Sequence, residues 1–592
     1  MKINPNNVED VLDGENYIVM RQNGGILQND DNYTYNINTD GFKTAKRGKT
    51  QAWAIFARLN ELPIISRQKH MFLVGLWIDD KKPNMNLYMD HFVDQANDIS
   101  NNGVAWDRAD GVQVISYFYP TFCVVDAMAR CEVLNTVTPT GFFSCNFCTH
   151  SGVYVNGGVK YPLLPPIPRP LPHRRTHDEL VECMINAPMQ GVKGPAAIMN
   201  LEHFDLGSGF STDDLHPIFL GAATFHLSIF MTSVGEDYYI GEPATRALIN
   251  SRLRSIRTPT FISRKPRDIK QYKSYQGTEM RNFLLYYMVP TLRGVMRDDA
   301  QEYLNHFALL SQAVFLLSRE TISPEDINEA ERCIDLYVEL FQEYFGEENM
   351  RYNLHILKHV VEMVRRWGPL YVQTTTNYES WNHHLVKNVT SPKGSVDQVV
   401  DRFLMSSFVT STLQRDDVSD RVKNNIMSIL EESLKNFVQV GNAKLVGRSF
   451  RRPPSDEELA LLQVRGYNPQ RVVQFKRIKV DGVEYRSRHY RYNGEETKSD
   501  DSYIYSWHDE FCQIDKILLV QEGEERAVFL TANVLRTLDP VNPSTTYIVE
   551  IDINIQNPLI LLTLDEIRIH AIRVNSRNHA SIMPVANRYE ID

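Results

Sequence analysis

Seven residues of this chain have types and spacings that could support metal chemistry. In chain order they are Asp40, Asp126, Cys145, Cys148, His355, His359 and Glu379. Carboxylates that converge on two Mg²⁺ or Mn²⁺ ions, about 3.5 to 4 Å apart, can drive attack on a phosphodiester. Cysteine and histidine are instead the ligands that zinc prefers. We therefore expect two catalytic Mg²⁺ or Mn²⁺ ions and one structural Zn²⁺.

The cysteine and histidine pairs could form the two halves of one zinc site. Cys145 and Cys148 have the spacing of metal ligands, although two nearby cysteines can also be small buried hydrophobic residues. His355 and His359 lie four residues apart and would share one helix face, which is also common by chance on an amphipathic helix. His150 is a competing ligand. Together the pairs would make a tetrahedral site that pins a helix to the core.

The acidic residues have simpler interpretations as well. Most of the 73 Asp and Glu residues must be solvated surface charges, and an Asp at a strand end usually forms a turn. Asp213, Asp214 and His216 follow the letters GFST, which is typical of a helix start. These acids could therefore simply cap a surface helix.

The first acids are positioned by a predicted sheet. Residues 33–40 alternate apolar and polar, which places Asp40 on the polar face at the end of a first strand. Residues 52–62 and 71–79 read as strands, 85–98 as a helix, and 112–126 as a buried strand ending on Asp126. This is the opening order of an RNase H-like fold, in which acids on the first and fourth strands meet at one sheet edge.

The rest of the chain changes character twice. A Pro-rich stretch at 162–172 predicts an extended linker, and helical spacing follows to about 350, with Ser323 and Pro324 as one helix start. A helix at 351–366 is ended by Gly368 and Pro369, and helix resumes at 377–389 around Glu379. After about 437, short alternating runs predict an antiparallel β domain.

The predicted fold class is α/β with an all-α insertion and a C-terminal all-β domain: an RNase H-like catalytic core interrupted by a large helical insertion. We expect an N-terminal tail (1–30), the first part of the core (31–140), a Cys-pair zinc segment with the Pro-rich linker (141–177), the α-helical insertion (178–350), return helices that complete the core (351–436) and the β domain (437–592).

Composition narrows the class of protein. The chain has 592 residues, of which 43% are hydrophobic, so it can bury several cores. Its seven cysteines are odd in number and thinly spread, which argues against a disulfide scaffold and for a reducing compartment. The N-terminus lacks a signal-like apolar region, and no uninterrupted apolar run reaches about 18 residues, so we expect neither secretion nor a transmembrane segment. The net charge of −10 requires any nucleic-acid contact to use local basic patches.

These residues, in order and with their flanking sequence, resemble the DDE transposases of the CMC (CACTA, Mirage, Chapaev) superfamily, animal type. The matching blocks are N-x-N-T-D-G-F (36–42), N-E-L-P (60–63), G-L-W (75–77), K-P-x-M (82–85), D-A-x-A-R (126–130), C-x-x-C-x-H-x-G (145–152), D-x-x-H (213–216), I-S-P-E-D (322–326), H-x-x-x-H (355–359), G-P-L (368–370) and Y-E-x-x-N (378–382). The resemblance covers roughly 35–400, and the layout is also similar to the catalytic subunit of the V(D)J recombinase.

The resemblance implies a role for each matched residue. Asp40, Asp126 and Glu379 become the catalytic, metal-binding acids, and the Cys145–Cys148 and His355–His359 pairs become the zinc ligands. His216 would contact the scissile phosphate, and Asn382 would orient Glu379 from one helical turn away. The chain departs from the pattern at Met128, where the family usually has Pro. So little chain precedes Asp40 that we expect a truncated copy or a domesticated host protein, without the family's N-terminal DNA-binding region.

Two functions follow from this pattern. The first is a DDE-type, metal-dependent DNA endonuclease and strand transferase that is nuclear, or cytoplasmic before import. The alternative is a domesticated, inactive nuclear protein that binds DNA or chromatin; a scaffold for protein partners is a weaker third. The DNA-binding candidates are Arg252, Arg254, Arg257, Arg264, Lys265, Arg267 and Lys270, with a second basic cluster between Lys476 and Arg491. A solvated basic face is the simpler reading of each. We also expect a homo-oligomer, a dimer being the first choice.

Overall fold

The computed structural model describes most of the chain and divides it into two compact units. It describes residues 6–44, 49–163, 172–389, 391, 394–415, 417–419, 421–423, 425–426, 436–491, 495, 497–555, 557–576 and 579–590. Unit 1 comprises Met1–Phe225 and Ala313–Asp417, and unit 2 comprises His226–Gln312 and Val418–Asp592. The predicted helical insertion, 178–350, is thus shared between the units. Most of the predicted Pro-rich linker lies outside the described residues.

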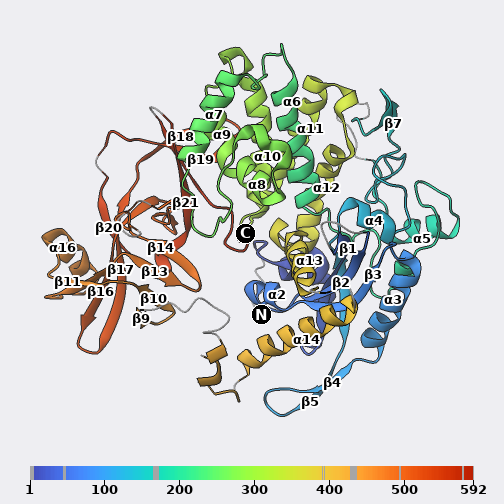
Figure 1. Ribbon diagram of the computed structural model, residues 1–592, viewed down its shortest axis with the longest axis horizontal. Coiled ribbons are helices and arrows are strands. Elements are labelled where there is room, and N and C mark those ends of the chain that lie inside the picture. The colour runs from blue at the N-terminus through green and yellow to red at the C-terminus, as the bar shows by residue number, and fades with distance from the viewer. Residues whose placement is uncertain are drawn as a thin grey trace. The chain divides into compact units, whose positions relative to one another are not determined.

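Unit 1 contains a four-stranded sheet surrounded by helices (Figure 1). Its elements are η1 (Val11–Asp13), α1 (Glu15–Arg21), β1 (Tyr33–Lys43), β2 (Gln51–Leu59), α2 (Ile64–Lys69), β3 (Phe72–Asp79), α3 (Met85–Asn101), β4 (Val104–Asp107), β5 (Gln113–Ser116), β6 (Phe118–Cys123), α4 (Ala127–Val133), β7 (Val153–Val155), β8 (Gly158–Lys160), α5 (His177–Ile185), η2 (Ala197–Asn200), the π-helix η3 (Leu215–Ala223), α11 (Pro324–Phe345), η7 (Glu347–Asn349), α12 (Tyr352–Trp367), η8 (Leu370–Val372), α13 (Thr376–Asn388) and α14 (Ser395–Gln414). Helices α6 (Thr224–Thr232) and α10 (Gln301–Leu317) each run from one unit into the other.

The sheet of unit 1 has the strand order β3-β2-β1-β6. β1 pairs antiparallel with β2, β2 pairs antiparallel with β3, and β1 pairs parallel with β6. Because β1 and β6 run in the same direction, the chain leaves both strands at the same edge of the sheet. Asp40 lies near that edge on β1, and Asp126 follows the end of β6.

Both faces of this sheet are covered by helices. Tyr88 of α3 approaches one face and donates a hydrogen bond to the carbonyl oxygen of Trp53, at 2.8 Å. On the other face Tyr378 of α13 packs against Phe56 and donates a hydrogen bond to Asn36, at 2.5 Å. The alternating polar residues of β1 therefore share one face, as predicted, but Asn36 and Asn38 are buried there beneath α13 rather than exposed to solvent.

The fourth predicted strand differs from the structure. Residues 112–126 are not one strand: β5 pairs with β4 in a separate hairpin, and β6 ends at Cys123. Asp126 is instead the residue that caps the N-terminus of α4, where its side chain accepts a hydrogen bond from the backbone N–H of Ala129 at 2.6 Å. Asp40 likewise does not end its strand, because β2 continues to pair with β1 as far as Lys43.

The N-terminal segment, predicted as a tail, packs on the core where it is described. Val11 and Tyr17 are buried in the core of unit 1. Asp10 forms a two-pronged ion pair with the buried Arg67, with N–O distances of 2.7 and 2.8 Å. A bidentate Arg–carboxylate pair fixes orientation as well as charge, so it holds the start of η1 to α2.

The start of α11, in the predicted insertion, and the end of the return helix α12 agree with the sequence signals. Ser323 caps α11, with Pro324 at its first position, and the side chains of Ser323 and Asp326 form a reciprocal capping box. Helix α12 ends at Gly368, whose φ of +94° is strained for residues with a side chain. The stretch 186–214, predicted to be helical, contains only η2, because Pro and Gly recur there.

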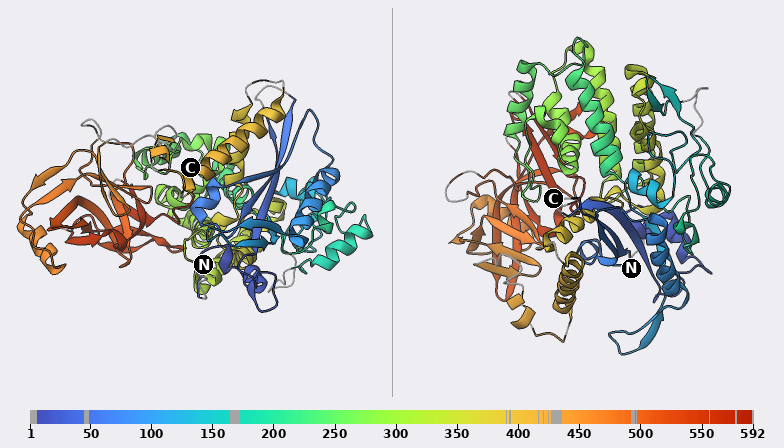
Figure 2. Two further views of the ribbon diagram at one scale, coloured as in Figure 1. Left: turned by 90° about the horizontal axis from the view of Figure 1, so that it is seen from below. Right: turned by 45° about the vertical axis from the view of Figure 1, so that its right-hand side comes forward.

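Unit 2 combines helices with antiparallel sheets, which Figure 2 shows from two further sides. Its other elements are α7 (Pro243–Ser255), η4 (Ile269–Ser274), α8 (Gly277–Asn282), η5 (Phe283–Tyr287), α9 (Met288–Leu292), η6 (Asp298–Ala300), β9 (Phe437–Val440), β10 (Ala443–Val446), β11 (Phe450–Arg452), α16 (Asp456–Val464), β12 (Val472–Phe475), β13 (Arg477–Val480), β14 (Val483–Arg486), β15 (Tyr503–Ser506), β16 (Phe511–Glu522), β17 (Glu525–Val534), β18 (Thr537–Asn542), β19 (Thr545–Ile551), β20 (Leu559–Thr563), η9 (Leu564–Glu566), β21 (Ile567–Asn575) and β22 (Ala580–Pro584). The C-terminal region is therefore a β region, but not all-β as predicted: α16 interrupts it, capped by Ser455 and Glu458.

One helical stretch of the described chain, Leu215–Thr232, is long and apolar enough to cross a membrane by length and composition alone. The criterion of an uninterrupted apolar run of about 18 residues did not identify this stretch, because polar residues interrupt it. Of this stretch, 56% is buried inside the protein, which is typical of a core helix.

Candidate functional site

The three predicted acids of unit 1 line one narrow pocket. Its lining residues are Asn38, Asp40, Asp126, His216, Thr375, Tyr378, Glu379 and Asn382. They come from β1, from the start of α4, from η3 and from the first two turns of α13. The structure thus brings together Asp40, Asp126 and Glu379, which lie far apart in the sequence, and adds His216 to them.

Asp40 and Asp126 are each fixed by local backbone geometry. The Asp40 carboxylate accepts a hydrogen bond from the N–H of Gly41, at 2.7 Å. Gly41 lies opposite Trp53 on β2, and a Cβ at position 41 would come within 2.5 Å of the Trp53 ring. Only glycine fits there, which explains the Asp-Gly pair. Asp126 has one carboxylate oxygen committed to capping α4, so its other oxygen is available to the pocket.

Glu379 is positioned by a buried polar network at the start of α13. The adjacent Tyr378 hydroxyl binds Asn36, whose amide donates in turn to Asn60 at 3.0 Å. The guanidinium of Arg58, fully buried, lies over the Tyr378 ring at 5.2 Å. Glu379 itself keeps 46% of its side-chain surface exposed. The network therefore anchors the helix, while the carboxylate remains open to solvent and to ligands.

The Asp213–His216 motif joins the same pocket. His216 Nδ1 donates to Asp213 Oδ2 at 2.7 Å, and His216 Nε2 lies 3.5 Å from Glu379 Oε1. A helix does start here, and the Asp213 carboxylate accepts from the N–H groups of Leu215 and His216, but Asp213 and Asp214 are each only 1% exposed, so the expected surface position is wrong.

The electrostatics of the pocket reflect crowding of carboxylates. Burial, with the charge of Asp126 next in size, raises the pKa of Asp40 to about 6. Burial also raises the pKa of Glu379 to about 7, although the nearby imidazole acts in the opposite sense. Burial disfavours the charged form of His216, but its hydrogen bond to Asp213 outweighs this and raises its pKa to about 9. At neutral pH the pocket therefore holds His216 as an imidazolium near Asp40 and Glu379, two carboxyl groups whose ionisation burial disfavours.

We expect Asp40→Asn to raise the free energy of unfolding by about 1 to 2 kcal/mol at pH 8 without added Mg²⁺ or Mn²⁺. The carboxyl titrates near 6 when folded and near 3.8 when unfolded, so its ionisation destabilises the fold above pH 6 and not below pH 4. Denaturant unfolding at pH 8 and pH 5 measures this, with the exposed Asp94→Asn on α3 as control. An equal gain at both pH values would contradict it.

Four residues in unit 1 form a buried cluster that could hold a metal ion: Cys145, Cys148, His355 and His359, whose ligand atoms all lie within 4.8 Å of one another. Cys145 Sγ lies 3.3 Å from His359 Nε2, and Cys148 Sγ lies 3.3 Å from His355 Nε2. The two Nε2 atoms are also 3.3 Å apart. The competing ligand His150 is excluded, because its Nε2 bonds the Pro162 carbonyl and its Nδ1 accepts from the Gly152 N–H, both at 2.9 Å.

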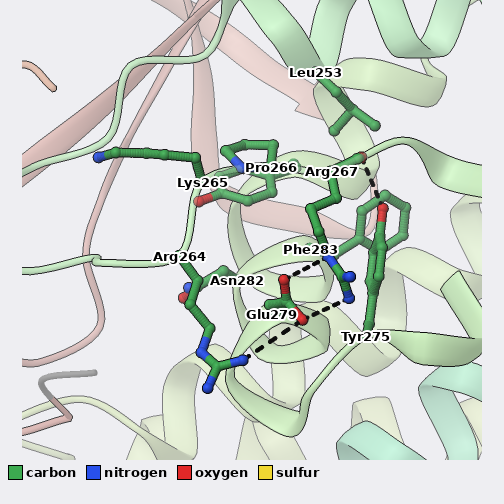
Figure 3. Close-up of a pocket in the computed structure, with 10 residues that line it drawn as sticks. Leu253, Arg264, Lys265, Pro266, Arg267, Tyr275, Glu279, Asn282 and Phe283 are labelled. Carbon is green, nitrogen blue, oxygen red and sulfur yellow. Dashed lines mark hydrogen bonds and ion pairs between the residues drawn. The ribbon is translucent and has the colours of Figure 1, made fainter. Parts of the chain in front are cut away.

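The basic segment of unit 2 is partly committed to structure. Arg267 binds Glu279 at 2.8 Å and the carbonyl of Ser274, and Arg264 lies 3.9 Å from the same carboxylate. Figure 3 shows both arginines directed toward Glu279, and Lys265 directed away from them. Burial lowers the pKa of Lys265, and its ammonium group donates to the hydroxyl of Thr258 at 2.8 Å.

The other predicted DNA-binding residues also include both side chains that stabilise the fold and side chains that are exposed. Arg252 donates to the carbonyl oxygens of Thr291 and Arg293, so it stabilises the end of α9. Arg254, Arg257 and Lys270 are exposed. In the β region, acidic partners bind three members of the predicted basic cluster: Arg477 and Arg486 pair with Glu484, and Arg488 pairs with Asp515.

Three pocket residues were not predicted from the sequence. Asn38 lies two residues before Asp40 and so on the same strand face, a spacing that could have identified it. Thr375 and Tyr378 flank the start of α13 close to Glu379, but Thr and Tyr carry no signal of this kind by type.

No protein-family model matches this chain, and no curated protein was found to match it.

Proposed function

We propose that this chain is a DDE-type, metal-dependent DNA endonuclease and strand transferase derived from a CMC-type transposase. The observation that carries the proposal is the convergence of Asp40, Asp126 and Glu379 on one pocket. The resemblance named these acids by their order in the chain, and they meet although nothing in their local sequence requires it.

The donor set of the pocket fits Mg²⁺ or Mn²⁺. Its lining offers carboxylate and amide oxygens, which these ions prefer. The side-chain oxygens of Asn38 and Asn382 are buried there without a hydrogen-bond partner, and such atoms favour a cation. The raised pKa values of Asp40 and Glu379 mark a cluster that positive charge would relieve. When bound, two such ions would activate the attacking oxygen and stabilise the leaving one.

The residues of the chain itself bind and orient the DNA phosphate. His216 donates from Nδ1 to Asp213, which leaves the Nε2–H directed at the pocket beside Glu379. An imidazolium there would donate a hydrogen bond to a phosphate oxygen and offset its charge. Asn382 lies one turn after Glu379 on α13 and lines the same pocket, so its amide can align the carboxylate or the phosphate.

The sheet of unit 1 supports an RNase H-like core. Its order β3-β2-β1-β6, antiparallel except for the β1–β6 pair, agrees with three antiparallel strands, a helix and a fourth strand that returns parallel to the first. Helices α11 to α13 bring the chain back to this sheet after the helical segment. The predicted meeting of acids at one sheet edge follows from the parallel β1–β6 pair.

Zinc is the ion that best fits the Cys145–Cys148–His355–His359 cluster. A tetrahedral ion with arms of about 2.3 Å to sulfur and 2.0 to 2.1 Å to nitrogen separates its ligand atoms by about 3.3 to 3.8 Å. The sulfur–nitrogen and nitrogen–nitrogen distances of 3.3 Å lie at the short end of that range. The four ligands leave no open position, as in structural rather than catalytic zinc sites.

The test is cleavage and joining of a pre-nicked DNA duplex by the full chain with Mg²⁺ or Mn²⁺, compared with amide variants of the three acids. Product that requires the ion and all three acids supports the proposal. Equal product from wild type and variants would instead favour the domesticated DNA- or chromatin-binding protein. Nuclear location, DNA as partner and a homodimer remain predictions of the same proposal.

We expect the exposed pair Arg254 and Lys270, replaced together by Ala, to weaken DNA binding and to lower the salt dependence of log K by about 2 at most, since each phosphate contact contributes about 0.9. Filter binding of generic duplex over a range of salt concentrations measures both. Arg267→Ala is the matched control, because it removes the closer of the two arginines beside the largely buried Glu279 and should lower stability rather than the salt slope. An unchanged slope in the double variant would exclude this DNA path.

A further inference from the structure

The buried carboxylate of Asp213 is the most heavily bonded acid around the candidate site. Its Oδ1 accepts from the N–H of Leu215 at 3.1 Å and from the N–H and hydroxyl of Thr375 at 3.1 and 2.9 Å. Its Oδ2 accepts from the N–H and Nδ1 of His216 at 3.2 and 2.7 Å. The carboxylate therefore bonds its own neighbours and also Thr375, which lies 162 positions further along the chain.

These hydrogen bonds link Asp213 to both Glu379 and His216, whose side chains line the pocket. Thr375 precedes the first turn of α13, and its carbonyl oxygen accepts from the N–H of Glu379 at 3.0 Å. Asp213 thus holds the N-cap residue of the helix that carries Glu379 and places a negative charge near its N-terminus, where such charge is favoured. The same carboxylate holds the His216 ring, whose Nε2 lies 3.5 Å from Glu379.

The backbone of Asp213 has an energetically unfavourable conformation. Its φ is +57°, a region that non-glycine residues rarely adopt and that costs about 1 to 3 kcal/mol. The side chain is 0% exposed, so an unpartnered charge here would be strongly destabilising. The hydrogen bonds to Thr375 and His216 offset both costs.

We propose that Asp213 and Thr375 are positioning residues that hold Glu379 and His216 in register across the pocket. Asp213 joins the first turn of η3 to the start of α13, where its partner Thr375 is the residue before that helix. Asp213 does not line the pocket, and the Thr375 hydroxyl is engaged with Asp213. The proposal rests on the proposed function for its effect on cleavage, but its effect on ion binding through Glu379 does not require that the protein cleaves DNA.

The test compares Thr375→Val with Thr375→Ser in the full chain. Val keeps the shape of the side chain and removes the hydroxyl donor, whereas Ser keeps the donor. Mn²⁺ affinity is measured by titration calorimetry, and Glu379→Gln identifies the part of the signal that depends on the pocket. Cleavage of pre-nicked duplex is measured in parallel, with zinc content and thermal unfolding as checks of the fold.

We expect Thr375→Val to weaken Glu379-dependent Mn²⁺ binding and to slow cleavage by about tenfold, as for other residues that orient metal ligands. Thr375→Ser should stay within about twofold of wild type in both. In an Asp213→Asn and His216→Gln cycle, the double variant should lose less activity than the product of the two single losses, because Asp213 acts in part through that ring.

The other outcomes are also decisive. Weaker Mn²⁺ binding by Thr375→Val in a protein that cleaves no DNA would uphold the positioning role and reject the nuclease. A Thr375→Val protein with wild-type Mn²⁺ affinity and rate would overturn the positioning role and leave the nuclease standing. The positioning role would also be overturned if Thr375→Val and Thr375→Ser lost Mn²⁺ affinity and rate equally and were both less thermally stable. Mn²⁺ binding that does not depend on Glu379 would overturn it too.

Discussion

Replacing Glu379 by Gln is expected to lower the rate of Mg²⁺- or Mn²⁺-dependent strand cleavage by at least about 10³-fold, as for members of a catalytic group that act together. Gln keeps the size and hydrogen-bonding capacity of the side chain but removes the charge that divalent ions require. The fold should persist, because the Tyr378–Asn36 contact anchors α13 independently of that carboxylate. DNA affinity measured without the ion should change by less than about twofold.

The matched control for this variant is Glu339→Gln, which removes one negative charge from an exposed position on α11. Single-turnover cleavage of the same pre-nicked duplex should be unaffected by it. If Glu379→Gln and wild type give the same product, the three acids are relics and the binding-protein alternative prevails.

Loss of the cysteine–histidine cluster is expected to have the largest effect on stability. Purified protein should contain close to one zinc per chain by elemental analysis, and Cys145→Ala should contain almost none. Apparent binding free energies of structural zinc are about 10 to 16 kcal/mol in small domains, so the variant should lose several kcal/mol of folding free energy or fail to fold. The DNA affinity of the variant protein that does fold should be affected much less than its stability.

The control for the zinc prediction is Cys333→Ala. Cys333 is 1% exposed on α11 in the same unit but lies outside the cluster, so its replacement should cost only about 1 kcal/mol of packing. Comparable losses of stability in the two variants, or wild-type protein without zinc, would reject a structural ion at this cluster.

Local signals in the sequence predicted the ends of helices well. Ser323 with Pro324 and the Gly368–Pro369 pair act through their own backbone chemistry, which needs no knowledge of the rest of the chain. Asn36 and Asn38 were harder, because an alternating polar face normally faces water. Their burial depends on α13, which arrives from residues far along the chain and supplies the Tyr378 hydroxyl.

The candidate site likewise contains residues that could be predicted from the sequence and residues that could not. The positions of Asp40, Asp126, His216 and Glu379 were predicted through a family resemblance, since no pattern in a single segment requires four distant residues to meet. The hairpin of β4 and β5 was missed because its residues 112–116 continue directly into the apolar β6 and read as one strand. Thr375 was missed because only its three-dimensional contact with Asp213 gives it significance.

The cysteine–histidine cluster also has a consequence for how this chain can vary. It joins Cys148 to His355 across 207 positions, so a bound ion would clamp the two ends of the intervening segment. The entropy of closing such a loop grows only with the logarithm of its length, and doubling the length costs about 0.6 kcal/mol. Changes in the length of surface loops between the clamp points therefore cost the fold of unit 1 little free energy. Such loops can vary while Asp213 and His216 keep their positions beside Glu379.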